Sequence, residues 1–228
     1  MKKLLFELAI VISLVTTITS CRSILGKNIQ MDSPEAIQAI KDAIKNNIDL
    51  TTFKITEISW SGKGSREKLD NKLGYLNVDL VDKNNKAYLQ QFTLNKEGKF
   101  AGEDMKEKSR EIYYEFVKGI DVDKLDAAII SKQLDEAKPL IGEKYEIKAL
   151  ESYSISEKTL DMSTKSINEK NPFFKGHNPD EYGSMSTRFT LDLLKKGEDK
   201  EINGRNITTN YYEVDFKVDE NGKLEINE

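Results

Sequence analysis

The chain contains one cysteine, Cys21, and one histidine, His177, and these two residues limit the chemistry that it can perform. A Cys–His catalytic pair would need both of them, and a structural zinc site draws its four ligands mainly from these residue types. A serine triad would depend on His177, which stands in the loop-like stretch NEKNPFFKGHNPDEYG without a G-x-S-x-G motif. The sequence therefore predicts a chain that is not an enzyme and that carries no metal or cofactor.

The stretch KVDENG near the C-terminus comes nearest to a cation-binding loop. Asp219, Asn221, Gly222 and Glu228 fall at positions 3, 5, 6 and 12 of an EF-hand, but Lys217 occupies position 1 and strands are expected on both sides. We therefore expect no calcium there. Acidic residues are numerous, yet spacing singles out no carboxylate pair for glycoside hydrolysis.

Residues 1–20 have the organisation of a secretion signal. Lys2 and Lys3 precede the apolar stretch 8–18, which ends at small residues. This stretch is too short to span roughly 30 Å of hydrocarbon, which takes about 20 helical residues. The pattern predicts a signal peptide rather than a resident membrane helix.

The residues that end this segment are Ile18, Thr19, Ser20 and Cys21, and they resemble the lipobox of bacterial lipoproteins. The resemblance implies cleavage before Cys21 and attachment of a diacylglyceryl group to its thiol, so that lipid holds the protein on a membrane. The alternatives are an ordinary secretory signal or a retained hydrophobic tail. Residues 21–32 would form a tether of about 35 to 40 Å at most. We expect a lipoprotein of the bacterial cell envelope, in the outer membrane if the cell is Gram-negative.

The remaining composition is that of a soluble globular chain and does not suit nucleic acid. Without residues 1–20, which include Lys2, Lys3 and Glu7, 33 basic residues face 38 acidic ones. Lysine alternates with Glu and Asp throughout, whereas binding to phosphates requires a concentrated basic face.

Two similar stretches, FTLNKEGKF from Phe92 and FKVDENGKL from Phe216, predict two β-hairpins. In each, apolar and polar residues alternate up to a turn with glycine, Gly98 or Gly222, which can adopt the positive φ that a tight hairpin needs. A second pair, FKITEIS from Phe53 and YEIKALE from Tyr145, shares its apolar spacing and a shift of phase typical of a β-bulge.

Each of the strands at 53 and 145 follows a helix signal. Ser33 is a suitable N-cap before Pro34 and the periodic isoleucines of the first helix, and Asp121 or Asp123 is the expected cap of the second. Middle strands are expected at 73–82 and 185–196. The sequence therefore predicts an α+β protein of two related halves, 33–102 and 121–228, each a helix followed by a three-stranded antiparallel meander.

Residues 103–120 are expected to connect the halves as a helix. Met105, Ser109, Ile112, Tyr113 and Phe116 fall at helical spacing, and Gly119 suits a C-terminal stop. The stretch IYYEFV could also form a strand.

A helix followed by a meander and a G-K turn is similar to the PepSY-like modules of bacterial envelope proteins, most closely in YYEVDFKVDENGKLEI, residues 211–226. The first half departs from this pattern, with Gln90 and Gln91 where the second has Glu213 and Val214. Inhibitors of β-lactamase that consist of tandem helix-plus-sheet units share this order of helix and strands. The resemblance implies a non-catalytic module that binds or inhibits other envelope proteins.

The insertion at 161–183 is the candidate binding segment. It holds Phe173, Phe174 and Tyr182 among turn residues, and aromatic side chains often anchor interfaces. The alternatives are that these rings cap the sheet or that the segment is disordered. We expect a lipid-anchored module that binds a protein or peptide partner. A carrier of a small hydrophobic ligand is the alternative function, and a hydrolase is the third.

Overall fold

The computed structural model describes residues 28–64, 69–161, 182–197, 200–203, 206–219 and 221–227. Its helices are α2 (Pro34–Asn47) and α3 (Ala127–Ile141), with 3-10 turns at Tyr114–Phe116 and Val122–Lys124. The strands are β1 (Phe53–Gly62), β2 (Leu73–Asp82), β3 (Lys86–Leu94), β4 (Phe100–Gly102), β5 (Lys106–Glu111), β6 (Tyr145–Glu157), β7 (Met185–Lys195), β8 (Lys200–Asn203), β9 (Asn206–Thr209), β10 (Tyr212–Val218) and β11 (Leu224–Ile226).

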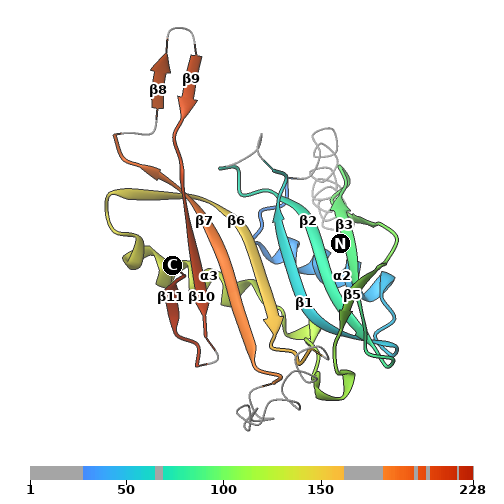
Figure 1. Cartoon of the computed structure of the whole chain (residues 1–228). Coiled ribbons are helices and arrows are strands. Elements are labelled where there is room, and N and C mark those ends of the chain that lie inside the picture. Colours follow the sequence, from blue (N-terminus) through green and yellow to red (C-terminus); the bar gives the residue numbers. More distant parts are fainter. Residues whose placement is uncertain are drawn as a thin grey trace, which may run out of the picture.

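Nine of these strands form one antiparallel sheet in the order β11-β10-β7-β6-β1-β2-β3-β4, with β5 paired to β3. Both helices lie behind this sheet in Figure 1, and β8 and β9 form a separate hairpin beyond its upper end. The prediction of two halves that each carry a three-stranded meander is therefore wrong. Strand β1 pairs with β6, which merges nine strands into one continuous sheet with one main core.

The predicted connecting helix at 103–120 is also wrong. Residues 106–111 form β5, whose polar side chains suit a strand at an edge of the sheet, and β5 takes its backbone partners from β3. Ile112 and Val117 pack beneath this segment in a small cluster with Val81 and Ala87. Burial of these apolar residues against the sheet outweighs the helical spacing of the segment.

The N-cap of α2 was predicted correctly from the sequence, and the N-cap of α3 was not. Ser33 caps α2 as predicted, accepting a hydrogen bond from the N–H of Ala36 at 3.1 Å. The cap of α3 is Asp126, which accepts from Ala128 N–H at 2.9 Å. Asp121 instead caps the short 3-10 turn that precedes α3. Two caps in succession shift the helix start to Ala127.

A row of large side chains crosses the helix-covered face of the sheet in register. The paired positions run from Phe216 through Phe189, Tyr153, Trp60 and Leu76 to Phe92. All are buried, and neighbouring rings from Phe216 to Trp60 stack with centroids 5.1, 6.0 and 4.7 Å apart. This row and the isoleucines of α2 fill the space between helix and sheet.

The two predicted hairpins are confirmed, and their turns have the same conformation. In β3–β4, Asn95 Oδ1 accepts from the N–H groups of Glu97 and Lys99. In β10–β11, Asp219 Oδ1 accepts from the N–H groups of Asn221 and Lys223. Gly98 and Gly222 both have φ of 77°. The predicted bulges are present too, as register shifts at Ile55/Glu57 and Ile147/Ala149.

The residues just before α2 belong to the core rather than to a free tether. Ile29 and Met31 are buried, and Gln30 forms a β-bridge with Lys72. The Trp60 indole N–H donates to Met31 O at 3.2 Å. Folded structure therefore includes the end of the segment that the sequence assigned to a tether.

Candidate functional site

Most of the residues that the sequence singled out lie outside the described part of the chain: Cys21, Phe173, Phe174 and His177. Tyr182 is described and is half-buried in the turn that leads into β7. The neighbouring Gly183 donates its N–H to Lys158 O at 3.0 Å. The described residues therefore place one of the three predicted contact aromatics, close to the end of β6.

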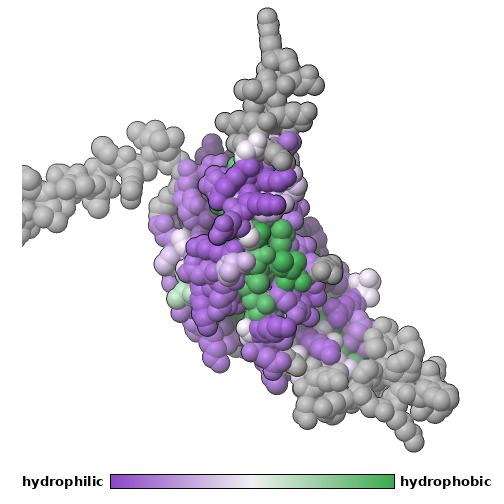
Figure 2. Space-filling view, turned by 90° about the vertical axis from the view of Figure 1, so that its left-hand side faces the viewer, coloured by the Kyte–Doolittle hydropathy of each residue, from purple (hydrophilic) through white to green (hydrophobic). Residues whose placement is uncertain are grey.

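A hydrophobic patch that the sequence analysis missed lies at the edge of the sheet where α3 contacts β11. Leu140 of α3 and Ile226 of β11 are 46% and 45% exposed, although both are large aliphatic residues. Half-buried Leu134, Ile141 and Leu224 pack between them and the core. Figure 2 looks onto this edge and shows a continuous hydrophobic area framed by hydrophilic residues. We call these five residues the α3–β11 patch.

Strand β11 ends the sheet beside the α3–β11 patch, and no strand of the described residues pairs with its outer edge. Asn227 N–H donates to Asp215 O and Asp219 N–H to Lys223 O, at 2.8 and 3.0 Å. Because alternate residues of an antiparallel strand turn their backbone groups to opposite sides, Leu224 and Ile226 point theirs away from β10. Their side chains lie on the helix-covered face, since they pair with Val218 and Phe216. Backbone donors, acceptors and apolar side chains are thus presented together.

The opposite edge of the sheet has a similar arrangement without such a patch. There α2 contacts β4, and Gly102 pairs with Phe92 as Ile226 pairs with Phe216. Phe100 is half-buried and packs against Phe92, with ring centroids 6.4 Å apart. No large hydrophobic residue of α2 or β4 is among the exposed ones in the described structure. Of these two helix–strand contacts at the sheet edges, only the one between α3 and β11 exposes large hydrophobic residues in the described structure.

The uncovered face of the sheet is polar and carries few large side chains at its centre. On the central strands, Ser59 and Ser61 of β1 lie opposite Ser154 and Ser152 of β6, and Ser156 of β6 lies opposite Glu57. Hydrogen bonds link the hydroxyls to the flanking strands: Ser152 donates to Thr190 at 3.1 Å, and Thr190 donates to Asp215 at 2.6 Å.

A group of charges lies on the same face. Glu57 and Asp79 are directly paired across β1 and β2, and Lys108 Nζ lies 2.5 Å from Asp79 Oδ2. Burial raises the pKa of Glu57, and the neighbouring charge of Asp79 raises it further, while Lys108 and Arg188 oppose the shift. A raised pKa is also found in catalytic acids. Here the carboxylate lies on a broad sheet surface beside a salt-bridged partner, which is typical of a structural charge cluster.

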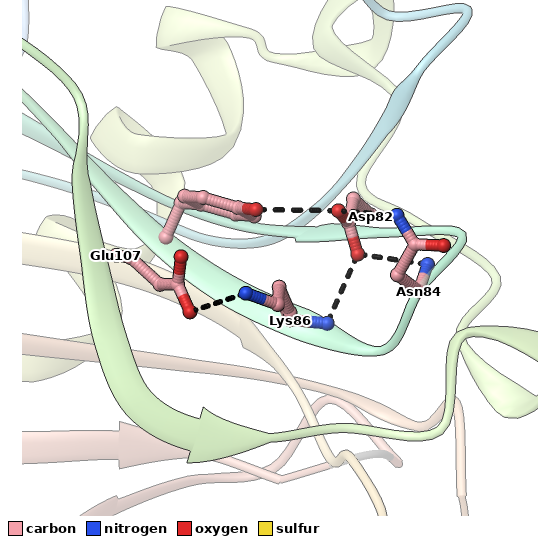
Figure 3. A network of polar contacts seen from close by, with 5 residues as sticks. Asp82, Asn84, Lys86 and Glu107 are labelled. Carbon is pink, nitrogen blue, oxygen red and sulfur yellow. Dashed lines mark hydrogen bonds and ion pairs between the residues drawn. The ribbon is translucent and has the colours of Figure 1, made fainter.

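The contacts in Figure 3 have a structural role in the β2–β3 hairpin. Buried Asp82 accepts hydrogen bonds from the N–H groups of Asn84 and Lys86, at 2.8 and 3.0 Å, and from the Tyr88 hydroxyl at 3.2 Å. Burial raises the pKa of Tyr88, and the Asp82 charge adds to this effect. Lys86 joins the hairpin to β5 through Glu107 at 2.8 Å. The contacts of Asp82 hold the turn, and the Lys86–Glu107 pair ties the hairpin to β5.

The described ranges contain no group of three or more His, Cys, Asp and Glu side chains placed to hold a metal ion. Of the helices in the part of the chain that is described, none has the length and apolar character that crossing a bilayer requires. Comparisons with protein families, curated proteins and solved structures found no match.

Proposed function

We propose that this chain is a non-catalytic binding module of the bacterial cell envelope, anchored through lipid on Cys21, and that it binds an extended segment of a protein or peptide partner along β11. The observation that supports this function is the coincidence of an unpaired strand edge with the α3–β11 patch. An added strand pairs with backbone groups of the edge, while alternate side chains provide specificity.

The register of β11 defines the segment that it would accept. A strand paired to the outer side of β11 directs every second side chain to the helix-covered face, because side chains alternate along a strand. There they would contact Ile226 and Leu140. The opposite face of β11 presents Glu225, which pairs with Lys223 at 3.8 Å. The partner segment is therefore apolar at alternate positions and polar between them.

The packing between the helices and the sheet favours surface binding over carriage of a ligand inside the protein. Ile40, Ile44, Trp60 and Leu76 are at most 1% exposed, and they occupy the space in which a small hydrophobic molecule would have to sit. An apolar carrier needs an interior cavity lined by such residues. The exposed apolar area lies at the edge of the sheet instead.

A lipid on Cys21 would keep this surface near the membrane. Ile29 is already packed in the core, so residues 22–28 are left as tether and reach at most about 25 Å when fully extended. The partner on this proposal is a protein of the envelope that comes within this distance of the bilayer. Phe173, Phe174 and Tyr182 remain proposed as additional contacts.

The test uses a partner purified from the protein's own cells in mild detergent and titrated with the full-length chain. We expect Ile226→Lys and Leu140→Lys each to weaken binding by more than tenfold, because a charge would enter a desolvated apolar contact. Leu50→Lys is the matched control, since Leu50 is 43% exposed but lies in the turn after α2. Equal affinities for all three variants and the wild type would reject the patch as the binding surface.

The predicted loop contacts need a separate variant. Replacing Phe173 and Phe174 together with serine should weaken binding while the melting temperature stays unchanged. A fall in melting temperature with unaltered binding would show instead that these rings stabilise the fold.

A further inference from the structure

Two positive charges face each other across β7 and β10 without a neutralising ion pair. Arg188 and Lys217 are register partners, so their side chains leave the same face of the sheet directly opposite each other. Like charges at such a pair are destabilising. Neither side chain forms an ion pair within the described ranges, although the uncovered face holds several carboxylates.

Each nearby carboxylate is engaged elsewhere. Asp215 accepts from Thr190 at 2.6 Å, and Asp219 accepts from the turn amides of Asn221 and Lys223. Glu225, the register partner of Lys217 on its other side, lies 3.8 Å from Lys223. Glu57 is near enough for Arg188 to affect its pKa. It is paired with Asp79 on β2 and with Ser156 on β6, so it borders the pocket without lining it.

The two cations line a pocket of about 460 Å³ together with hydroxyl groups. Ser156 and Ser186 are register partners on β6 and β7, and their Oγ atoms are 3.1 Å apart. In such a pair one hydroxyl proton bonds the two oxygens, which leaves the other free to donate outward. Ser184 and Lys158 line the pocket too. Two acidic residues, Glu157 and Asp219, line the pocket as well. Both Glu157 oxygens accept backbone N–H groups, from Lys118 and Gly119 at 2.7 Å, and Asp219 Oδ1 accepts the turn amides.

We infer that this pocket binds a phosphate-type oxyanion, with Arg188 and Lys217 as the charge partners and Ser156 and Ser186 as hydroxyl donors. Arginine offers a planar fork that matches phosphate oxygens, and lysine adds a point charge. A bound dianion removes the repulsion across the β7–β10 pair. The phosphate can belong to a lipid headgroup or be free in solution, because both present the same oxygens. The inference is independent of what binds the α3–β11 patch.

The experiment follows backbone and side-chain resonances of the full-length chain in neutral detergent. Inorganic phosphate is added in one series, and a short-chain phosphatidylglycerol is compared with the matching phosphatidylcholine in another. We expect saturable shifts at Ser156, Ser186, Arg188 and Lys217 that chloride at equal ionic strength does not produce. Shifts with inorganic phosphate assign a free anion, and shifts with phosphatidylglycerol alone assign a headgroup. Shifts in neither series, or equal shifts with chloride, would overturn the site.

Variants distinguish binding of phosphate at this site from nonspecific screening of surface charge. Arg188→Gln should weaken binding at least tenfold. Lys217→Gln should likewise weaken binding at least tenfold, because it removes the second charge partner of the anion. Lys99→Gln, in the equivalent hairpin at the other edge, removes one positive charge and should leave binding unchanged. Unaltered affinity in either Arg188→Gln or Lys217→Gln would contradict the inference.

Discussion

The indole ring of Trp60 stacks on the phenol ring of Tyr153 with centroids 4.7 Å apart, and this contact joins the two central strands of the sheet. Trp60 comes from β1 and Tyr153 from β6, nearly a hundred residues later in the chain. The Tyr153 hydroxyl donates to Gln133 Oε1 of α3 at 2.6 Å. One side chain thus connects both strands of the junction with a helix.

Removing the Tyr153 hydroxyl should destabilise the protein. Tyr153→Phe keeps the ring stack but leaves Gln133 Oε1 buried without its donor, which costs about 1 to 3 kcal/mol. Urea unfolding measures the change. Tyr75→Phe is the control, because Tyr75 is 43% exposed on the polar face, and it should alter the free energy of unfolding by less than about 0.5 kcal/mol. Equal effects of the two substitutions would contradict this role of Tyr153.

The same hydroxyl makes stability depend on alkaline pH. Burial raises the pKa of Tyr153 to about 12, above the ordinary value of 10.0. The folded state therefore holds this proton where the unfolded state has lost it, so its contribution is complete below pH 10 and falls as pH rises toward 12. The expected loss is up to about 3 kcal/mol. Denaturant unfolding across this range should show a steeper fall for the wild type than for Tyr153→Phe, and parallel curves would argue against it.

The raised pKa of Glu57 should likewise make the free energy of unfolding fall as pH rises, here in the acidic range. Its raised pKa means that the folded state disfavours the charged form, so stability is greatest below the ordinary pKa of 4.5 and declines as pH rises through the folded pKa. Glu57→Gln should therefore be more stable than the wild type at pH 7, by less than about 1 kcal/mol because solvent reaches this face. Calorimetry at pH 3 should find no difference. A less stable variant at pH 7 would indicate that attraction to Lys108 and Arg188 dominates.

The turn before β11 requires glycine. Gly222 has φ of 77°, and a Cβ added there would meet nothing within 4 Å, so the cost of a substitution is backbone strain alone. Gly222→Ala should lower the free energy of unfolding by about 1 to 2 kcal/mol. Gly222→Asn should cost less, since asparagine tolerates this region of φ. Chemical denaturation of the two variants measures the order, and equal losses would point to a cause other than φ.

Local sequence signals predicted the parts of the fold that depend on near neighbours. Ser33 and Pro34 started α2 where the structure has it, and Gly98 and Gly222 marked both hairpin turns. The single sheet could not be predicted in this way, because it depends on pairing between β1 and β6. Nothing within FKITEIS specifies that Trp60, which follows it, will stack on Tyr153.

The candidate site was missed for a related reason. Ile226 continues an alternation of apolar and polar residues that is equally suited to a strand inside a sheet. Only the order of the strands shows that β11 lies at an edge. The exposure of Leu140 follows from how α3 sits on the sheet, which the sequence of the helix does not specify. Arg188 and Lys217 become neighbours only through the β7–β10 register.

The most direct test of partner binding along β11 is amide hydrogen exchange of the full-length chain, alone and with its purified envelope partner. The N–H groups of Leu224 and Ile226 point away from β10, so they should exchange rapidly in the free protein. An added strand would bond them, and we predict strong protection of both amides on binding, with little change at β4. A bound partner that leaves Leu224 and Ile226 exchanging at their free rates would contradict the proposed function of this edge.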